Sequence, residues 1–208
     1  ESGEDQDHCQ ETYGCRVVER LARHGALTSP RTVLAHCVHL DAAERRLLGQ
    51  APAWIAQNAE SNANNAVGRF SSTGLPAERT LLGTDGLHSD MRRAMQVAYF
   101  LSQEGDPLSP LGAWRRLQGG PRYLRANQLL PEAAADLVAL RYDPPTPLTR
   151  EPAPAHAVFG LPLAGVEAVV ARGKLVYHQG RILTLDESTI AREARRQAER
   201  LWQAMLAR

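Results

Sequence analysis

The sequence lacks the features that mark membrane-spanning and nucleic-acid-binding proteins. Glycine, proline or glutamate interrupts each apolar run before it reaches the roughly 18 residues that a membrane-spanning helix needs. Basic residues number 24 and acidic residues 23, so the formal net charge of +1 gives no electrostatic reason to expect binding to nucleic acid or anionic lipid. With 208 residues, 43% of them hydrophobic, the chain is long enough for one large or two small globular domains.

Cysteine is scarce. Cys9, Cys15 and Cys37 are odd in number, and a chain of this size does not need disulfides for stability, so we expect reduced thiols in a cytoplasmic protein. Cys37 lies between His36 and His39, which raises the possibility of a zinc site made of cysteine and histidine. The chain has no second cysteine pair at zinc-finger spacing, and this possibility is therefore disfavoured.

The first residues lack an initiator methionine and a signal-peptide pattern. The opening segment, "ESGEDQDHCQETYG", is polar and strongly acidic and leads directly into a predicted helix. We therefore expect the sequence to be part of a longer protein.

Short apolar runs alternate with amphipathic segments through the first half of the chain. Strands are predicted at residues 31–38, 51–58 and 79–86, each bounded by polar or turn residues. Helices are predicted at residues 41–49, where Asp41 and Glu44 have the spacing of a capping box, and at residues 89–103. This alternation is typical of parallel strand–helix units in an α/β fold.

The pattern changes after Gly119. Apolar, β-branched runs at residues 134–145, 156–163 and 166–182 are separated by glycine and proline, which predicts antiparallel strands. A final amphipathic helix is predicted after Asp186. The chain accordingly divides into three predicted parts, at residues 1–118, 119–185 and 186–208.

Polar side chains follow two of the predicted parallel strands. His36 and His39 follow "TVLA" at the end of the first, and Asp85 follows "LLGT" at the end of the third. If these strands belong to an α/β barrel, their carboxyl ends share one mouth, where an imidazole and a carboxylate suit zinc or iron. The alternatives are a hydrogen-bonded core histidine for His36, a loop position for His39 and a turn aspartate for Asp85. His88 is a further candidate near Asp85, but its loop position favours exposure to solvent over ligation.

Three motifs carry a family resemblance. In order, "AHCVHLDAAE", "NAESNANNAVG" and "LLGTDGLHSDM" resemble the second half of a metal-dependent amidohydrolase. The likeness is to the aminohydrolase and deaminase branch that includes guanine deaminase, the s-triazine hydrolases and the aminohydrolases of the SsnA type. It implies the C-terminal part of a (β/α)8 TIM-like barrel, about strands six to eight, with part of a composite β-sandwich and a C-terminal helix that packs on the barrel.

The resemblance also implies roles for individual residues. Asp85 matches the carboxylate that ligates the metal and accepts a proton from its water, and His36 matches the histidine that orients the metal-bound hydroxide or the group under attack. Glu1 falls at the position of the glutamate that shuttles protons. Ser61 and Asn62 match a loop that lines the substrate pocket.

Two positions in that pocket loop depart from the family pattern. Gln57 stands where the pattern has histidine, and Ala59 stands where it has proline. Both substitutions lie in the pocket loop and therefore affect its contacts with the substrate. Gln57 is included among the substrate-binding candidates.

The implied activity is metal-dependent hydrolysis of a C–N bond. One divalent metal is expected, zinc first and iron second, acting on a purine-like or other N-heterocyclic small molecule. The remaining ligand histidines and the N-terminal half of the barrel are expected upstream of Glu1, so this chain alone is expected to be inactive, and a homodimer is possible. The alternatives are a chlorohydrolase or other amidohydrolase on the same scaffold, or a catalytically incomplete fragment or pseudoenzyme with a binding role.

Overall fold

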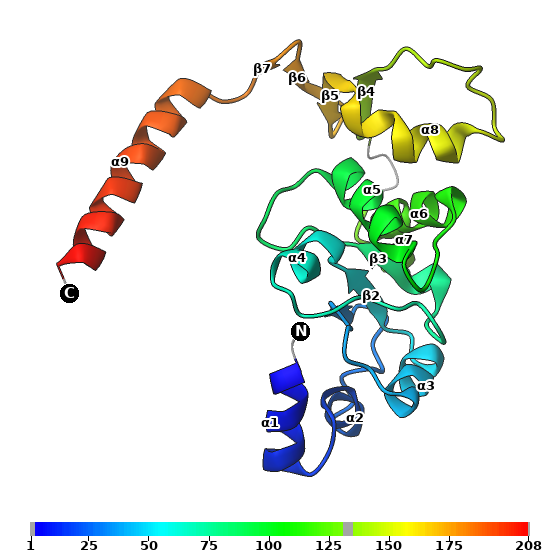
Figure 1. The fold of residues 1–208 in the computed structure, drawn as a ribbon. Helices are drawn as coiled ribbons and strands as arrows, with labels where there is room; N and C mark the ends of the chain where they lie inside the picture. The colour runs from blue at the N-terminus through cyan, green and yellow to red at the C-terminus, as the bar shows by residue number, and fades with distance from the viewer. Residues whose placement is uncertain (1–2, 131–134, 208) are drawn as a thin grey trace. The chain divides into compact units, whose positions relative to one another are not determined.

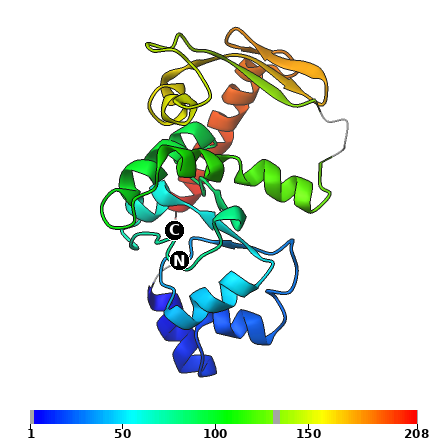
Figure 2. The same cartoon turned by 90° about the vertical axis from the view of Figure 1, so that its right-hand side faces the viewer.

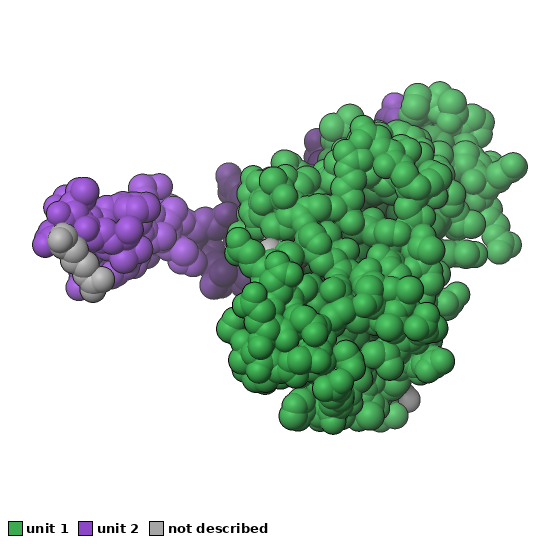
Figure 3. Space-filling model, turned by 60° about the horizontal axis from the view of Figure 1, so that its bottom comes forward, with its two compact units in different colours: residues 1–131, 144–163 green, residues 132–143, 164–208 purple. Residues whose placement is uncertain are grey.

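The computed structural model describes residues 3–130 and 135–207, which fall into two compact units. The first unit comprises residues 1–131 and 144–163, and the second comprises residues 132–143 and 164–208 (Figure 3). The second unit therefore has two separate stretches of chain, because the segment between them returns to the first unit.

The first unit is built on three parallel strands, β1 (Val33–Ala35), β2 (Trp54–Gln57) and β3 (Thr80–Leu82). Their order across the sheet is β1-β2-β3, with α3 (Ala42–Gln50) in the connection from β1 to β2. The predicted parallel strand–helix units are thus confirmed, and Figure 1 labels the neighbouring strands β2 and β3. Within the part of the chain that the structure describes, these strands form an open sheet and no closed barrel.

Helices of the first unit pack beside this sheet and on one another (Figures 1 and 2). The remaining helical elements of the first unit are α1 (Gly3–Tyr13), α2 (Val17–Arg23), α4 (Ala59–Asn64), η1 (Ala77–Arg79), α5 (Met91–Ser102), α6 (Pro110–Leu117), α7 (Gly119–Ala126), α8 (Ala153–Phe159) and η2 (Leu161–Leu163). The capping box predicted at the start of α3 is present, because Asp41 accepts from the Glu44 N–H while the Glu44 carboxylate accepts from the Asp41 N–H.

Two apolar clusters hold these helices to the strands. Ile55 of β2 packs with Leu48 of α3 and Val18 of α2, while Leu82 of β3 packs with Met95 of α5. Ile55 and Met95 are fully buried, and each such side chain contributes about 1.5–3 kcal/mol to stability. This packing fixes the positions of the strands and therefore of the loops that follow their carboxyl ends.

The prediction of a strand at residues 156–163 is wrong. The structure has α8 and η2 there, and Ala157 and Val158 of α8 are buried in the cluster formed with α5 and α6. Prolines at positions 152 and 154 suit the first turn of a helix, and a short apolar run does not by itself distinguish a buried strand from a buried helix.

The second unit contains an antiparallel sheet. Its strands are β4 (Leu137–Arg141), β5 (Gly165–Ala171), β6 (Lys174–His178) and β7 (Arg181–Ile182), in that order. Arg172 and Gly173 have φ values of 50° and 73° in the β5–β6 turn, as a tight hairpin requires. The antiparallel strands predicted around these residues are therefore confirmed.

The last helix, α9 (Glu187–Leu206), begins where the sequence predicts, because the Asp186 carboxylate accepts from the Thr189 N–H at 3.1 Å. Hydrogen bonds from the Thr189 and Ser188 hydroxyls lower the pKa of Asp186 to about 2. The packing of this helix on the barrel stays a prediction. Among the described residues, no helix is both long enough and apolar enough to cross a membrane.

Candidate functional site

His36 and Asp85 are brought together at the carboxyl ends of the parallel strands. His36 directly follows β1, and its N–H donates to the Ala56 carbonyl of β2 at 2.9 Å. Asp85 lies in the loop after β3. The His36 Nε2 and Asp85 Oδ2 atoms are 3.7 Å apart. Both residues adopt left-handed backbone, with φ values of 68° and 54°, a conformation that persists only where the surrounding structure holds it.

Helix α4, which starts directly after β2, contacts both side chains. The Ser61 hydroxyl donates to Asp85 Oδ2 at 2.6 Å, and Asn62 Oδ1 lies 2.7 Å from His36 Nδ1. Ser61 and Asn62 are buried, with 3% and 2% exposure. Two adjacent residues of one short helix therefore hold the carboxylate and the imidazole in place.

The contact with Asn62 determines the tautomer of the neutral His36 ring. An amide oxygen only accepts hydrogen bonds, so Nδ1 carries the hydrogen and Nε2 is left as an acceptor. Nε2 and the Asp85 carboxylate then present lone pairs to one another across 3.7 Å, which is too long for a direct hydrogen bond. Such a pair suits a cation or a water molecule that contacts both.

The pKa of Asp85 lies below its ordinary value. The Ser61 hydroxyl is the main cause, followed by the Gly86 N–H, which donates to Oδ1 at 2.8 Å, while His36 contributes through its charge only when its ring is protonated. Asp85 is therefore an ionised carboxylate at neutral pH, the form in which it can ligate a metal.

The donor set fits part of a metal site. Catalytic zinc has three protein ligands drawn from His, Cys, Asp and Glu. Over residues 3–130 and 135–207, no group of three or more such side chains is placed to hold an ion. Asp85 and His36 could supply two donors, and a complete site needs at least one more.

Asn58, which the sequence analysis did not single out, connects the two loops. Its Nδ2 atom is 3.4 Å from His36 Nε2, and a Cβ atom added to Gly83 would lie 2.1 Å from its Oδ1. Glycine at position 83 therefore lets the Asp85 loop approach Asn58. The signal available in the sequence was its place beside Gln57 in the pocket-loop motif.

Gln57 is engaged by a buried cation. Its Oε1 accepts from Arg116 Nη1 of α6 at 2.5 Å, and both side chains are buried. Burial lowers the pKa of Arg116 to about 10. Gln57 and Asn62 both line a cavity of about 300 Å³ with Phe70 and Leu101 among its walls, and His36 and Asp85 are not among its lining residues.

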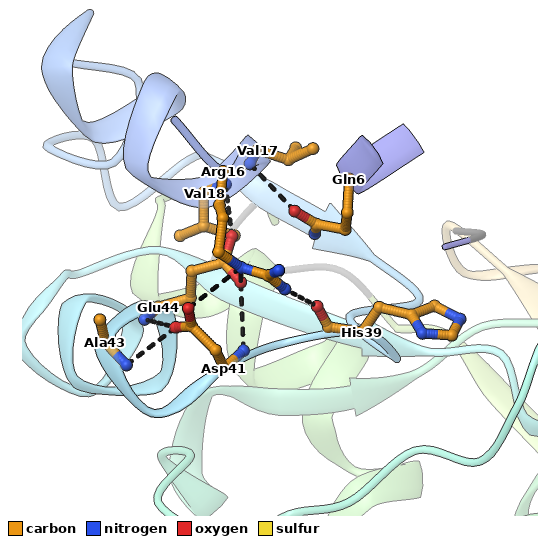
Figure 4. Close-up of polar contacts among 8 residues, drawn as sticks. All are labelled: Gln6, Arg16, Val17, Val18, His39, Asp41, Ala43 and Glu44. Atoms are coloured by element: carbon orange, nitrogen blue, oxygen red, sulfur yellow. Dashed lines mark hydrogen bonds and ion pairs between the residues drawn. The ribbon is translucent and has the colours of Figure 1, made fainter. Parts of the chain in front are cut away.

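His39 belongs to the loop that carries His36, but its ring faces a different partner. Its Nε2 atom lies 2.6 Å from the Val67 carbonyl. Figure 4 shows the other contact of His39, whose carbonyl accepts from Arg16 Nη2 at 2.5 Å. Arg16 Nε also donates to the fully buried Glu44 carboxylate at 2.8 Å. The loop after β1 is thereby anchored to α2 and α3.

His88 contacts a carboxylate other than Asp85. Its Nε2 atom lies 2.7 Å from Glu60 Oε2 of α4, and its Nδ1 accepts from the Asp90 N–H at 3.1 Å. The imidazole is 24% exposed, so it is more enclosed than a free loop side chain. Glu1, the predicted proton shuttle, lies outside the described residues.

No family model matches the chain. It is 32% identical to the 5-methylthioadenosine/S-adenosylhomocysteine deaminase of Desulforudis audaxviator (strain MP104C), over 91% of this chain and 47% of that protein. It is 28% identical to a 5'-deoxyadenosine deaminase of Methanococcus maripaludis, over 86% and 46%. The chain thus spans about half the length of these curated relatives.

Solved structures share the fold. An adenosine deaminase from Xanthomonas campestris with bound zinc superposes with a TM-score of 0.80 at 23% identity, covering 98% of this chain and 49% of that one. Escherichia coli guanine deaminase has a TM-score of 0.71 at 22% identity, covering 86% and 46%. The zinc complex of the atrazine chlorohydrolase TrzN from Arthrobacter aurescens TC1 has a TM-score of 0.71 at 19% identity, covering 93% and 46%.

Proposed function

Because the chain belongs to the amidohydrolase and deaminase family, we propose that the whole protein hydrolyses a C–N bond and releases ammonia. The chain itself spans about half the length of the relatives that it matches. The observation that carries this proposal is the Asp85 carboxylate, held by Ser61, facing His36 Nε2 at 3.7 Å. The substrate class that we infer is an amino-substituted N-heterocycle. Adenosine derivatives come first, since both curated relatives above are named as deaminases of such compounds.

A divalent metal, zinc first and iron second, would supply Lewis acidity and lower the pKa of water to about 7. Asp85 would hold that ion through its carboxylate and accept a proton from the attacking water. His36 would orient the group under attack through Nε2, since Asn62 holds the other ring nitrogen. We assign protonation of the heterocycle nitrogen to Glu1, and contacts with the substrate to Ser61, Asn62 and Gln57.

The remaining metal ligands are proposed to come from the half of the family fold that this chain does not span. Asp85 offers one donor where a catalytic zinc site has three protein ligands. The zinc-bound adenosine deaminase and chlorohydrolase structures share this fold, which supports zinc as the first choice.

The test uses the full-length protein, measured for metal by elemental analysis and for ammonia release from 5'-deoxyadenosine, 5-methylthioadenosine and guanine. We expect about one metal ion per chain and ammonia from at least one purine. Asp85→Ala should abolish both metal and turnover, while the control Glu78→Ala, at an exposed position, should change neither.

Other outcomes assign the protein differently. Chloride release from a chloro-s-triazine without ammonia release from any purine would indicate a chlorohydrolase. Metal-free full-length protein that releases neither product would contradict the hydrolase proposal and favour a binding role.

A further inference from the structure

We propose that Glu60 is a positioning residue, which holds the loop carrying Asp85 against α4 and so sets where the Asp85 carboxylate lies relative to His36. The expected effects on zinc affinity and activity rest on the proposed function. The expected effect on loop exchange rests only on the contacts of Glu60.

Glu60 forms a junction between α4, the Asp85 loop and α5. Its Oε2 atom lies 2.7 Å from His88 Nε2 and 3.1 Å from Arg93 Nε, and a second Arg93 nitrogen donates to Oε1. The Glu60 and His88 side chains are 19% and 24% exposed, so their contact is partly shielded from water, whereas Arg93 is 59% exposed. Arg93 lowers the pKa of Glu60, with His88 adding to the effect, and Glu60 therefore acts as a carboxylate.

His88 transmits this contact to the loop. Its Nδ1 accepts from the Asp90 N–H at 3.1 Å, and a backbone N–H only donates, so the ring hydrogen of neutral His88 lies on Nε2 and is donated to Glu60. The Asp90 side chain in turn accepts from the first N–H groups of α5. Glu60 thus holds both the end of the loop and the start of the following helix.

Three consecutive residues of α4 contact the three parts of the site. Glu60 contacts His88, Ser61 contacts Asp85, and Asn62 contacts His36. Successive residues of a helix point about 100° apart, so one short helix can reach partners on different sides. Six residues are too few for a helix to be stable alone, so the position of α4 depends on such contacts.

Loss of the Glu60 contact should loosen the Asp85 loop. Asp85 has a φ of 54°, a strained conformation that its surroundings must maintain. Without Glu60, the loop end at His88 is no longer tied to α4, and the hydrogen bond from Ser61 has to hold the carboxylate against that strain. The carboxylate would then sample positions farther from His36.

The test compares Glu60→Ala, Glu60→Gln and the control Glu104→Ala in the full-length protein. Glu104 is a matched control, because it also forms an ion pair with an arginine, Arg69, in the first unit. The measurements are amide hydrogen exchange of residues 83–90, zinc affinity, kcat and KM. The melting temperature is followed to separate local loosening from unfolding.

Glu60→Ala should accelerate exchange in residues 83–90 and weaken zinc binding and kcat about 10- to 100-fold, the usual effect of removing a group that orients a metal ligand. KM should change much less than kcat, because the substrate contacts are retained. Glu60→Gln should lie closer to the wild type than Glu60→Ala, since its amide oxygen still accepts from His88 Nε2 while its amide nitrogen loses the contact that Oε1 makes with Arg93. Glu104→Ala should match the wild type throughout.

His88→Ala keeps the inference testable if Glu60→Ala fails to fold. His88→Ala should change exchange, zinc affinity and kcat in the same direction as Glu60→Ala. The double variant should be no worse than the more severe single variant, because each single substitution already removes the contact between Glu60 and His88. Exchange and zinc affinity at wild-type levels in Glu60→Ala, or fully additive effects in the double variant, would overturn the proposal. If the wild-type protein itself binds no zinc and releases no ammonia, the proposed function fails, while the exchange data still decide the role of Glu60.

Discussion

The Nε2 atom of His36 and the Oδ2 atom of Asp85 lie 3.7 Å apart, although β2 separates the strands that precede them. The distance is set by α4, which leaves the end of β2 and donates to Asp85 through Ser61 while Asn62 contacts His36. The helix that follows the middle strand therefore fixes the distance between two side chains that lie after the outer strands. The arrangement leaves two acceptors facing one another, as a shared cation or water requires.

Asn62→Ala should change the tautomer of His36. Without the amide oxygen, Nδ1 loses the acceptor that holds its hydrogen, and the neutral imidazole should shift toward its Nε2–H form. The ring nitrogens are observed directly by long-range ¹H–¹⁵N correlation NMR at a pH where the imidazole is neutral. Asn64→Ala, on an exposed face of the same helix, should leave the tautomer unchanged. An unchanged spectrum in Asn62→Ala would contradict this account of the ring.

Local pattern was sufficient to predict the parts of the fold that depend on neighbouring residues. The apolar runs of β1, β2 and β3 and the capping residues Asp41 and Glu44 are each specified within a few residues of sequence. The meeting of His36 and Asp85 was also predictable, because parallel strands end at the same edge of a sheet.

Features that depend on tertiary contacts were not predictable in the same way. The run that forms α8 is apolar in either conformation, and packing against α5 and α6 decides it. His88 was expected in solvent, since the sequence does not show that Glu60 comes within 2.7 Å of it. Asn58 begins the pocket-loop motif, but its close approach to Gly83 depends on the fold and does not show in the sequence.

Glu44→Ala should destabilise the first unit by about 2–4 kcal/mol, because it removes a fully buried carboxylate from three partners. That carboxylate accepts from Arg16 Nε, from the Val18 N–H and from the Asp41 N–H (Figure 4). Urea unfolding measures the change. The exposed Glu78→Ala is the control, and a loss no larger than that of the control would show that the cluster contributes little.

Asp106→Asn should lower stability in a pH-dependent manner. The Ser72 hydroxyl and N–H, at 2.7 and 2.5 Å, hold the pKa of Asp106 below its ordinary value, with a further contribution from the charge of Arg116. A lowered folded-state pKa stabilises the protein above the unfolded pKa of about 3.9, and that stability is lost as the pH falls through the folded value.

The free energies of unfolding of wild type and Asp106→Asn should therefore differ most near neutral pH and converge in acid. Urea titrations at a series of pH values between 7 and 3 give the comparison, with Glu78→Gln as the control. A difference that stays constant down to the lowest pH would assign the effect to packing rather than to the charge.

Gly119 and Gly120 are adjacent at the start of α7, but only the substitution of Gly119 by alanine should destabilise the protein. A Cβ at Gly119 would lie 2.5 Å from Leu81 Cβ and 2.7 Å from Leu81 Cα, so α7 or β3 would have to move. Gly119→Ala should cost about 1–3 kcal/mol, as overpacking in a core does. A Cβ at Gly120 meets nothing within 4 Å, so Gly120→Ala should be neutral or stabilising by up to about 1 kcal/mol through helix propensity. Equal melting temperatures for the two variants would mean that α7 does not pack this closely on β3.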